Sequence, residues 1–333
     1  MQLVVVGAGG TGGYFGAKLA RGGEDVTFLA RGAHLKAIRE NGIRIRSAVE
    51  GNWQIKVRAV ETLQDHAPVD LVLFCVKSFD TESAAELIKP VIGPNTGVLS
   101  IQNGVDNEEK IGRILGPGRV MGGVAYVFSH IQAPGVIAHN QFGRIVFGEM
   151  DGTISERASA FAEACGRAAI PVEIVRDIRK MLWSKYVSLA PIAGATALTR
   201  LPVKFIREVP ETHRLWQMQA EELLALAARE DAGLEPDMME RCAKFLESLA
   251  PTNYSSLYQD LAQGKRLELD AMHGYAVKLG ERHGIPTPAM FLVYAALKPY
   301  IAGPPSPKRY REARCLPAGL EPAGLKATDF CAT

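Results

Sequence analysis

Cysteine is scarce in the sequence, and its distribution argues against both a disulfide framework and a metal centre. The 333 residues include five cysteines and no C-x-x-C pair. They are Cys75, Cys165, Cys242, Cys315 and Cys331. An odd number of widely spaced thiols is typical of a reduced, cytoplasmic protein. The seven histidines are scattered as well, so we predict no metal site.

Long apolar runs and an excess of one charge are also missing. No apolar stretch approaches the roughly 18 residues of a membrane-spanning helix, and no basic leader precedes the first strand, so we expect neither a membrane span nor a signal peptide. The formal net charge is only +2, which gives no strong field for nucleic acid or an anionic membrane. We therefore expect a cytoplasmic protein with a small-molecule partner and no nucleic-acid or membrane partner. The sequence leaves open whether it forms a homodimer.

The amino end of the chain carries a motif for binding a nucleotide. The apolar run Met1–Val6 leads directly into Gly7-Ala8-Gly9-Gly10-Thr11-Gly12, and small residues continue to Gly16. A strand, then Gly-x-Gly-x-x-Gly, then a helix is the dinucleotide-binding turn, with the pyrophosphate at the helix N-terminus. A glycine-rich turn alone can be only a tight connection, but its place between strand and helix favours cofactor binding. The predicted cofactor contacts are Gly7, Ala8, Gly9, Gly10, Thr11 and Gly12.

The end of the second strand indicates which dinucleotide is bound. The predicted strand Asp25–Ala30 is followed by Arg31, where an NAD site would carry an acid that binds the ribose 2′-OH. A guanidinium can instead grip a 2′-phosphate with paired hydrogen bonds. We therefore predict NADP (NADPH) as the cofactor. The alternative is that Arg31 is a solvated arginine at a strand end.

Two further polar residues follow predicted buried strands. Lys77 comes directly after the apolar strand Val69–Val76, and Asn103 lies just beyond the strand Gly97–Ile101. In an open α/β sheet the ligand binds outside the carboxyl ends of the strands. Both side chains are therefore predicted to reach a cofactor or substrate, although by position alone each could be an ordinary polar residue at a strand end.

The chain divides into a half that alternates strands and helices and a half that is helical. Other predicted elements of the first half are a helix at 33–41, hairpin-like runs at 43–46 and 54–57, and strands at 119–124, 135–139, 144–148 and 171–175. From residue 178 onward the pattern is helical, with breaks at proline and glycine. We expect an α/β, Rossmann-type NADP-binding domain (1–177), an all-α substrate and catalytic domain (178–303) and a poorly ordered tail (304–333).

Together with several later motifs, these features resemble the ketopantoate reductase (2-dehydropantoate 2-reductase) family. The later motifs are Gln102-Asn103-Gly104, Trp183-Ser184-Lys185, the run Asn253–Asp260, and Arg266–Asp270 followed by Gly274. Their order and spacing match over about residues 1–303, and they are more specific than the glycine turn. The resemblance implies an NADPH-dependent oxidoreductase of pantothenate biosynthesis that reduces a 2-oxo acid to a 2-hydroxy acid, with ketopantoate as the favoured substrate.

The resemblance also implies roles for individual residues. Lys185 would supply the proton and the positive charge that the developing alkoxide needs, and Glu268 would hold the reacting oxygen and tune Lys185. Asn103 would bind the cofactor ribose and the substrate, while Asn253 and Ser256 would bind the substrate carboxylate and hydroxyl. Without the resemblance, Lys185 and Glu268 would be ordinary charged helix residues, and Asn253 and Ser256 would be helix caps.

Two positions depart from the family pattern. In the family, asparagines follow the catalytic lysine four and eight residues later on the same helix face, whereas this sequence has Leu189 and Ala193. Ser188 and Thr196 lie near that face and are candidates to replace them in part. The departure favours a second interpretation, a reductase of a more apolar 2-oxo acid. A third, a non-catalytic NADPH-binding sensor, is disfavoured by the retained lysine and glutamate.

Overall fold

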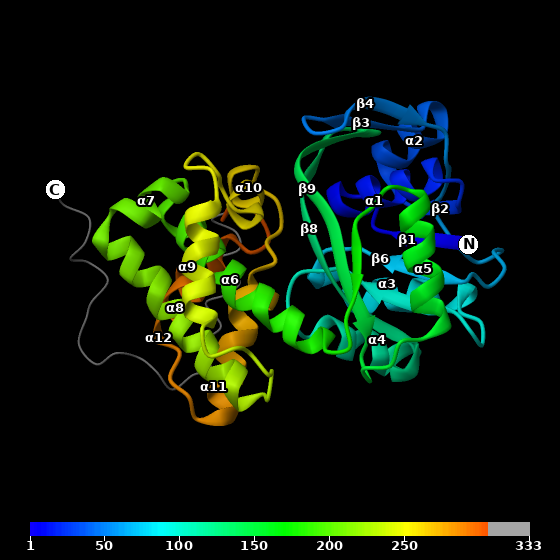
Figure 1. Ribbon diagram of the computed structural model, residues 1–333. Coiled ribbons are helices and arrows are strands. Elements are labelled where there is room, and N and C mark those ends of the chain that lie inside the picture. The colour runs from blue at the N-terminus through cyan, green and yellow to red at the C-terminus, as the bar shows by residue number, and fades with distance from the viewer. Residues whose placement is uncertain (306–333) are drawn as a thin grey trace, which may run out of the picture.

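The structure is a computed structural model that describes residues 1–305. It has an α/β half and a helical half that lie side by side, joined by the long helix α6 (Figure 1). The strands are β1 (Gln2–Val6), β2 (Asp25–Leu29), β3 (Ile43–Ser47), β4 (Gly51–Ile55), β5 (Arg58–Val60), β6 (Leu71–Phe74), β7 (Gly97–Ser100), β8 (Val120–Ala133), β9 (Val136–Glu149) and β10 (Val172–Ile174). The helices of the α/β half are α1 (Gly10–Arg21), α2 (Gly32–Asn41), α3 (Thr81–Leu87), α4 (Asn107–Leu115) and α5 (Glu156–Arg167).

The helical half begins directly after the last strand. Its elements are α6 (Ile178–Thr199), α7 (Val203–Glu208), α8 (Pro210–Arg229), α9 (Met238–Ser248), α10 (Ser256–Ala262), a π-helical turn at Asp270–Gly274, α11 (Tyr275–His283) and α12 (Pro288–Leu297). The carboxylate of Asp177 caps α6 by accepting a hydrogen bond from the Lys180 N–H at 3.0 Å. Helices α8 and α12 each open on a proline, whose fixed φ suits the first helical position. The predicted fold class, a Rossmann-type α/β half followed by an all-α half, is confirmed.

One sheet organises the α/β half. Within the described residues its order is β4-β3-β9-β8-β7-β6-β1-β2-β5, with β10 paired to β9. The strands from β5 to β8 along this order all pair in parallel. Because side chains alternate along a strand, β1 serves two cores. Leu3 and Val5 pack in the core with α1 and α5, and Val4 and Val6 pack in the core with α3 and α4. Helices therefore cover both faces, as a parallel sheet requires.

The largest error of the sequence-based prediction concerns strands β8 and β9. The pattern predicted three short strands at 119–124, 135–139 and 144–148, whereas the structure has one antiparallel hairpin of two 14-residue strands. Register shifts between Tyr126 and Val127 and between Phe128 and Ser129 interrupt the regular pairing. Bulges of this kind break the two-residue alternation on which strand prediction depends. The second hairpin run was also misplaced, since β4 ends at Ile55, and β5 was missed.

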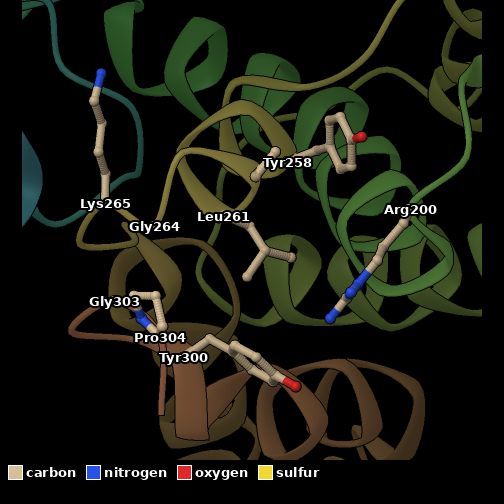
Figure 2. Close-up of a pocket in the computed structure, with 9 residues that line it drawn as sticks. Arg200, Tyr258, Leu261, Gly264, Lys265, Tyr300, Gly303 and Pro304 are labelled. Atoms are coloured by element: carbon tan, nitrogen blue, oxygen red, sulfur yellow. The ribbon is translucent and has the colours of Figure 1, made fainter. Parts of the chain in front are cut away.

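A large pocket lies in the helical half, at the exposed end of α10. Its cavity volume is about 300 Å³, and it is lined by Arg200, Tyr258, Leu261, Ala262, Gly264, Lys265, Tyr300, Gly303 and Pro304 (Figure 2). None of the predicted site residues is among them. The guanidinium of Arg200 lies 5.8 Å from the centre of the Tyr300 ring, which is an ordinary cation–π contact. Several of the predicted site residues instead gather where the two halves meet.

Three sequence-based expectations concern features of the whole chain. No helix within residues 1–305 is both long enough and apolar enough to cross a membrane. In the same residues, no group of three or more His, Cys, Asp or Glu side chains is arranged to hold a metal ion. The predicted tail at 304–333 lies, apart from its first two residues, outside the described part of the chain.

Candidate active site

The glycine turn between β1 and α1 is shaped for a close-lying ligand. Gly7 has a φ of +93°, and a Cβ there would come within 2.8 Å of the Cys75 backbone at the end of β6. A Cβ on Gly12 would lie 2.2 Å from the Gly7 carbonyl oxygen, and one on Gly10 would lie 2.3 Å from the Ser129 carbonyl oxygen. A Cβ on Gly9, in contrast, would meet no atom within 4 Å. The turn is therefore tightly packed on three sides and open at Gly9.

The open side of the turn is where a pyrophosphate would approach. Gly9 is the N-cap residue of α1, and no side chain caps this helix end. The N–H groups of a first helical turn, together with the helix dipole, favour an anion. Ala8 and Thr11 flank this opening, at the end of the turn and in the first turn of α1. The residues present therefore fit the diphosphate of a dinucleotide.

Sequence analysis missed a histidine that fixes this turn. His34, near the start of α2, accepts a hydrogen bond from the Gly135 N–H on Nδ1 at 3.0 Å. Its Nε2 consequently carries the proton and donates to the Ala8 carbonyl oxygen at 2.8 Å. Burial lowers the pKa of His34, which favours this neutral form. The imidazole thus ties the glycine turn to the tip of the β8–β9 hairpin, and no sequence motif indicated it.

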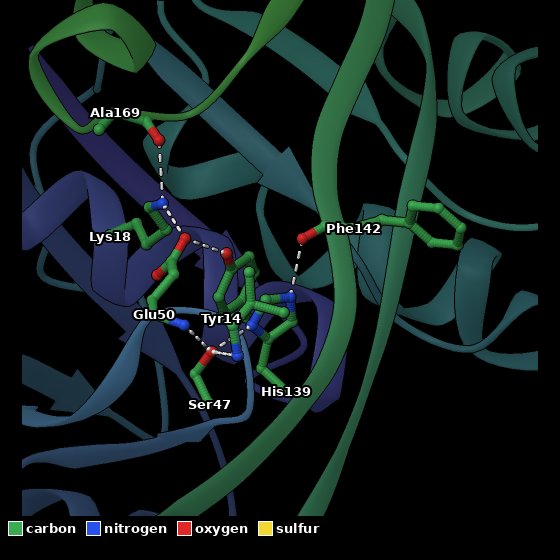
Figure 3. Close-up of polar contacts among 8 residues, drawn as sticks. Tyr14, Lys18, Ser47, Glu50, His139, Phe142 and Ala169 are labelled. Carbon is green, nitrogen blue, oxygen red and sulfur yellow. Dashed lines mark hydrogen bonds and ion pairs between the residues drawn. The ribbon is translucent and has the colours of Figure 1, made fainter.

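A partly buried polar network holds the back of α1 in place. Lys18 donates to the Glu50 carboxylate at 2.6 Å, and the Tyr14 hydroxyl donates to the same oxygen at 2.9 Å (Figure 3). Glu50 lies in the β3–β4 turn, where its N–H donates to the Ser47 hydroxyl. Ser47 in turn contacts His139 Nδ1 at 2.8 Å, and the His139 ring stacks on Tyr14. The nucleotide-binding helix is thereby fixed to both β3 and β9.

Arg31 lies at the carboxyl end of β2, as the sequence predicted. It is the N-cap residue of α2, and its side chain is 86% exposed. One guanidinium nitrogen lies 3.4 Å from the Asp80 carboxylate, a loose contact that a phosphate could replace. The side chain is thus exposed where the 2′-phosphate contact was predicted, and that contact stays a prediction. No motif indicated the nearby acid.

Lys77, Glu268 and Asp260 form a charged cluster between the two halves. The Lys77 ammonium lies 2.8 Å from an Asp260 oxygen and 2.9 Å from a Glu268 oxygen. The other Glu268 oxygen accepts a hydrogen bond from the Ser78 N–H at 3.0 Å. Burial lowers the pKa of Lys77, but the two carboxylates outweigh it, and the pKa is raised overall. The structure shows Lys77 joining the tip of β6 to two carboxylates of the helical half, and its contact with the cofactor stays a prediction.

Lys185 projects from α6 towards the strand β8. Its ammonium donates a hydrogen bond to the Ala125 carbonyl oxygen at 3.0 Å. Burial lowers the pKa of Lys185 to about 8, while the charges of Glu268 and Glu108 act to raise it. A lysine in this state is protonated at neutral pH but gives up its proton far more readily than an ordinary lysine. That is the property of a general acid.

A narrow pocket, a crevice with a cavity volume of only about 10 Å³, lies where the two halves meet. It is lined by Asn103, Leu189, Ala193, Ser256, Leu257, Asp260, Glu268 and Met272. Three of the predicted site residues, Asn103, Ser256 and Glu268, are thus brought together. Leu189 and Ala193, the two departures from the family pattern, both line the pocket. Half of its lining side chains are consequently apolar.

Other predicted positions play different parts. The Asn253 backbone accepts a hydrogen bond from the Val203 N–H, and its side chain does not line this pocket. The predicted cap was wrong, because the side chain that caps α10 is Ser255 and neither Asn253 nor Ser256. A cap must stand one residue before the first helical turn, and this helix begins at Ser256.

The two hydroxyl residues proposed as substitutes for the missing asparagines are occupied elsewhere. Thr196 is fully buried, and its hydroxyl contacts the Ile192 carbonyl oxygen in α6 at 2.8 Å and the Ser255 hydroxyl at 2.7 Å. Ser188 donates to the Ser184 carbonyl oxygen at 2.8 Å, one turn earlier in α6. Neither side chain lines the pocket, so neither replaces an asparagine there. Both hydroxyls instead contact carbonyl oxygens one turn earlier in α6, which is common for serine and threonine inside helices.

Two further residues support the site from α4 and β7; Gln102 belongs to a predicted motif but was given no role, and Glu108 was not singled out. Gln102 donates to the Val76 carbonyl oxygen at 2.9 Å and to the Thr81 hydroxyl at 2.8 Å, which holds the tips of β6 and β7 together. Glu108, in the first turn of α4, is buried. Adjacent acids at a helix start usually lie in solvent, so no pattern in the sequence singles out Glu108.

Comparison with known proteins identifies the family. The model described as ketopantoate reductase PanE/ApbA matches residues 3–152, and its C-terminal counterpart matches residues 177–301. The chain is similar to the 2-dehydropantoate 2-reductase of Archaeoglobus fulgidus, with 34% identity over 85% of this chain and 92% of the relative. It is also similar to an uncharacterized oxidoreductase, YkpB, of Bacillus subtilis, with 30% identity over 91% of this chain and 99% of the relative.

Solved structures agree with this assignment. The crystal structure of a PanE/ApbA family ketopantoate reductase from Ralstonia eutropha superposes with a TM-score of 0.84 and 33% identity, covering 90% of this chain and 98% of that one. The two family models together span both halves described above. The sequence and the structure thus lead to one assignment: the chain belongs to the ketopantoate reductase family and is an oxidoreductase of the 2-dehydropantoate 2-reductase type that uses NADP(H).

Proposed function

We propose that the protein reduces a 2-oxo acid to a 2-hydroxy acid with NADPH, and that ketopantoate is the favoured substrate. The observation that carries this proposal is the state of Lys185. Its ammonium is partly buried with a pKa of about 8, on the same helix face as two residues that line the pocket. A proton donor with a lowered pKa beside a pocket, in a chain that also carries a nucleotide-binding turn, suits carbonyl reduction.

The reaction requires this chain to stabilise negative charge on the carbonyl oxygen and to donate a proton to it. Bound NADPH supplies the hydride that reaches the carbonyl carbon. As the carbonyl oxygen takes on negative charge, Lys185 stabilises it and then transfers a proton from Nζ to that oxygen. The Ala125 carbonyl oxygen, which accepts a hydrogen bond from Lys185, holds the ammonium on the β8 side of α6 and so directs the remaining N–H groups.

Other residues would orient the substrate and tune the lysine. Asn103 and Ser256 line the pocket from opposite halves, so a substrate held by both would bridge the two halves. Glu268 is fixed by Lys77 and the Ser78 N–H, and its charge raises the pKa of Lys185. We assign Glu268 to keeping Lys185 protonated. Asn253, whose side chain does not line the pocket, keeps the role in binding the substrate carboxylate or hydroxyl that the family resemblance implies.

A second candidate keeps the chemistry but changes the substrate. Leu189 and Ala193 give the pocket an apolar wall, and a site without hydrogen-bonding groups discriminates only weakly for a substrate hydroxyl. A 2-oxo acid with an apolar side chain would suit this wall. The non-catalytic sensor is less well supported, because a sensor has no use for a lysine with a lowered pKa.

The test is to mix the purified protein with NADPH and a panel of 2-oxo acids and to follow the loss of NADPH absorbance. We expect turnover that falls by about 10²–10⁴-fold in Lys185→Ala, as for loss of a general acid, with little change in NADPH affinity. Glu268→Ala should also lower turnover. Lys180→Ala, a change on the same helix beside Glu235, is the matched control. Turnover near the unmodified level in Lys185→Ala would remove this lysine from the mechanism, and no turnover with any 2-oxo acid would favour the sensor.

A further inference from the structure

Arg266 brings a second guanidinium close to Arg31 from the other half of the molecule. It lies between α10 and the π-helical turn, and its side chain is 54% exposed. One of its guanidinium nitrogens lies 3.9 Å from one oxygen of the Asp80 carboxylate. The guanidinium of Arg31 lies 3.4 Å from the other oxygen of the same carboxylate. A single carboxylate therefore stands between an arginine of the α/β half and an arginine of the helical half.

Two sets of contacts hold Arg266 in this place. Its guanidinium carbon lies 4.1 Å from the centre of the Phe79 ring, a cation–π contact that orients the planar group. Its backbone pairs with Ala302 in an isolated bridge, and the next residue, Leu267, donates to the Ile301 carbonyl oxygen at 2.9 Å. A side chain that is already oriented loses less freedom when a ligand binds.

Four consecutive residues beyond the end of β6 fix the distance between the two halves at this point. The Lys77 ammonium and the Ser78 N–H both donate to the Glu268 carboxylate, at 2.9 Å and 3.0 Å. The next two residues of the chain both contact Arg266. The position of Arg266 relative to the α/β half is therefore set by a continuous line of contacts and does not depend on one loose ion pair.

This place in the fold is where the adenosine end of a dinucleotide would lie. Strands β2 and β6 are the two neighbours of β1 in the sheet, so their carboxyl ends flank the glycine turn that fits the diphosphate. Arg31 follows β2, and Asp80 lies beyond β6. The 2′-phosphate of NADP(H) carries up to two negative charges and three acceptor oxygens. Such a group attracts two guanidinium groups more strongly than one carboxylate does.

We propose that Arg266 binds the 2′-phosphate of NADP(H) together with Arg31, in the place that the Asp80 carboxylate takes between them. One arginine then binds the phosphate from the α/β half and the other from the helical half, so the cofactor links the two halves at its adenosine end. The preference for NADPH over NADH accordingly depends on a residue of the helical half as well as on the end of β2. This inference concerns the cofactor alone and is independent of which 2-oxo acid is reduced.

Calorimetric titration of the protein with NADPH and with NADH tests this role, because the two cofactors differ only in the 2′-phosphate. Arg266→Gln should weaken NADPH binding by about tenfold, the lower end for a charge-assisted hydrogen bond, and leave NADH binding unchanged. Lys265→Gln is the matched control, since it removes the same charge from the neighbouring exposed residue, and it should change neither affinity. Undiminished NADPH binding in Arg266→Gln, or an equal loss for both cofactors, overturns the proposal.

Two further variants separate a shared phosphate contact from a general effect of charge. Asp80→Asn should strengthen NADPH binding by about two- to fivefold, the value of an exposed ion pair, because it removes the carboxylate that competes with the phosphate. The double variant Arg31→Gln/Arg266→Gln should bind NADPH no more tightly than NADH. The proposal is wrong if Asp80→Asn does not strengthen NADPH binding or if the double variant still prefers NADPH. These titrations need no substrate, so a lack of turnover with every 2-oxo acid would refute the proposed reductase function and leave their result unaffected.

Discussion

Replacing Lys185 with methionine should stabilise the protein at neutral pH while it abolishes turnover. Methionine keeps the apolar stem of the lysine but removes the charge. Burial lowers the pKa of Lys185 from 10.5 to about 8, whereas in the unfolded chain the pKa returns to about 10.4. If this burial were complete, the charged lysine would destabilise the folded state by about 3 kcal/mol at pH 7. Because the side chain keeps some contact with solvent, we expect about 1–2 kcal/mol.

The sign of the pH dependence makes this prediction specific. Between pH 8 and 10.5 the folded protein has lost the Lys185 proton and the unfolded chain still binds it, so the unmodified protein gains stability as pH rises through this range. The advantage of Lys185→Met should therefore shrink from pH 7 to pH 10. Urea unfolding, followed by the fluorescence of Trp183 and Trp216, measures the free energy of unfolding of both proteins at pH 7 and at pH 10. Lys278→Met, on the exposed face of α11, is the control. A Lys185→Met variant that is less stable at pH 7, or whose advantage is the same at pH 10, would show that the charge of Lys185 carries no burial cost.

Three further predictions concern the cofactor and the substrate. Arg31→Ala should weaken NADPH binding by roughly 10–100-fold, the value of a charge-assisted contact, and leave NADH binding nearly unchanged; equal losses for both cofactors in a binding titration would exclude a phosphate contact. Gly9→Ala should fold normally but bind NADPH poorly, because its methyl group occupies the open side of the turn, whereas Gly12→Ala should unfold at lower urea concentration because its Cβ would lie 2.2 Å from a carbonyl oxygen. The double change Leu189→Asn/Ala193→Asn should move kcat/KM towards ketopantoate relative to 2-oxoisovalerate, and a strong preference of the unmodified protein for ketopantoate would contradict the argument from the apolar wall.

The sequence was most informative where local chemistry alone determines structure. The turn from Gly7 to Gly12 could be predicted because close packing there excludes any Cβ at Gly7, Gly10 and Gly12. The start of α6 after Asp177 follows from capping. The hairpin β8–β9 could not be predicted, because its bulges destroy the alternation that marks a strand.

The site was only partly predictable, since its contacts join residues far apart in the chain. Lys77 and Glu268 are 191 positions apart, and nothing local to either residue indicates that they form an ion pair. Glu108 and Glu109 look alike in sequence, yet one is buried and the other is exposed. Such differences depend on which helix face meets the sheet. The roles of Asn253 and Ser256, and the boundary between domains at residue 177, stay predictions.

The long β8–β9 hairpin has a consequence for which insertions and deletions the chain can tolerate. Ala125 on β8 holds the ammonium of Lys185, Ser129 on the same strand touches the start of α1 beside Gly10, and Gly135 at the tip donates to His34. Three points along one stretch of strand are therefore set at fixed spacings. A single inserted residue between Ala125 and Ser129 would turn the following side chains to the opposite face of the sheet. It would also change the position of Lys185 relative to the glycine turn. The hairpin sets the distance between the proton donor and the nucleotide-binding turn. Insertions and deletions should therefore be far better tolerated in the loops of the helical half.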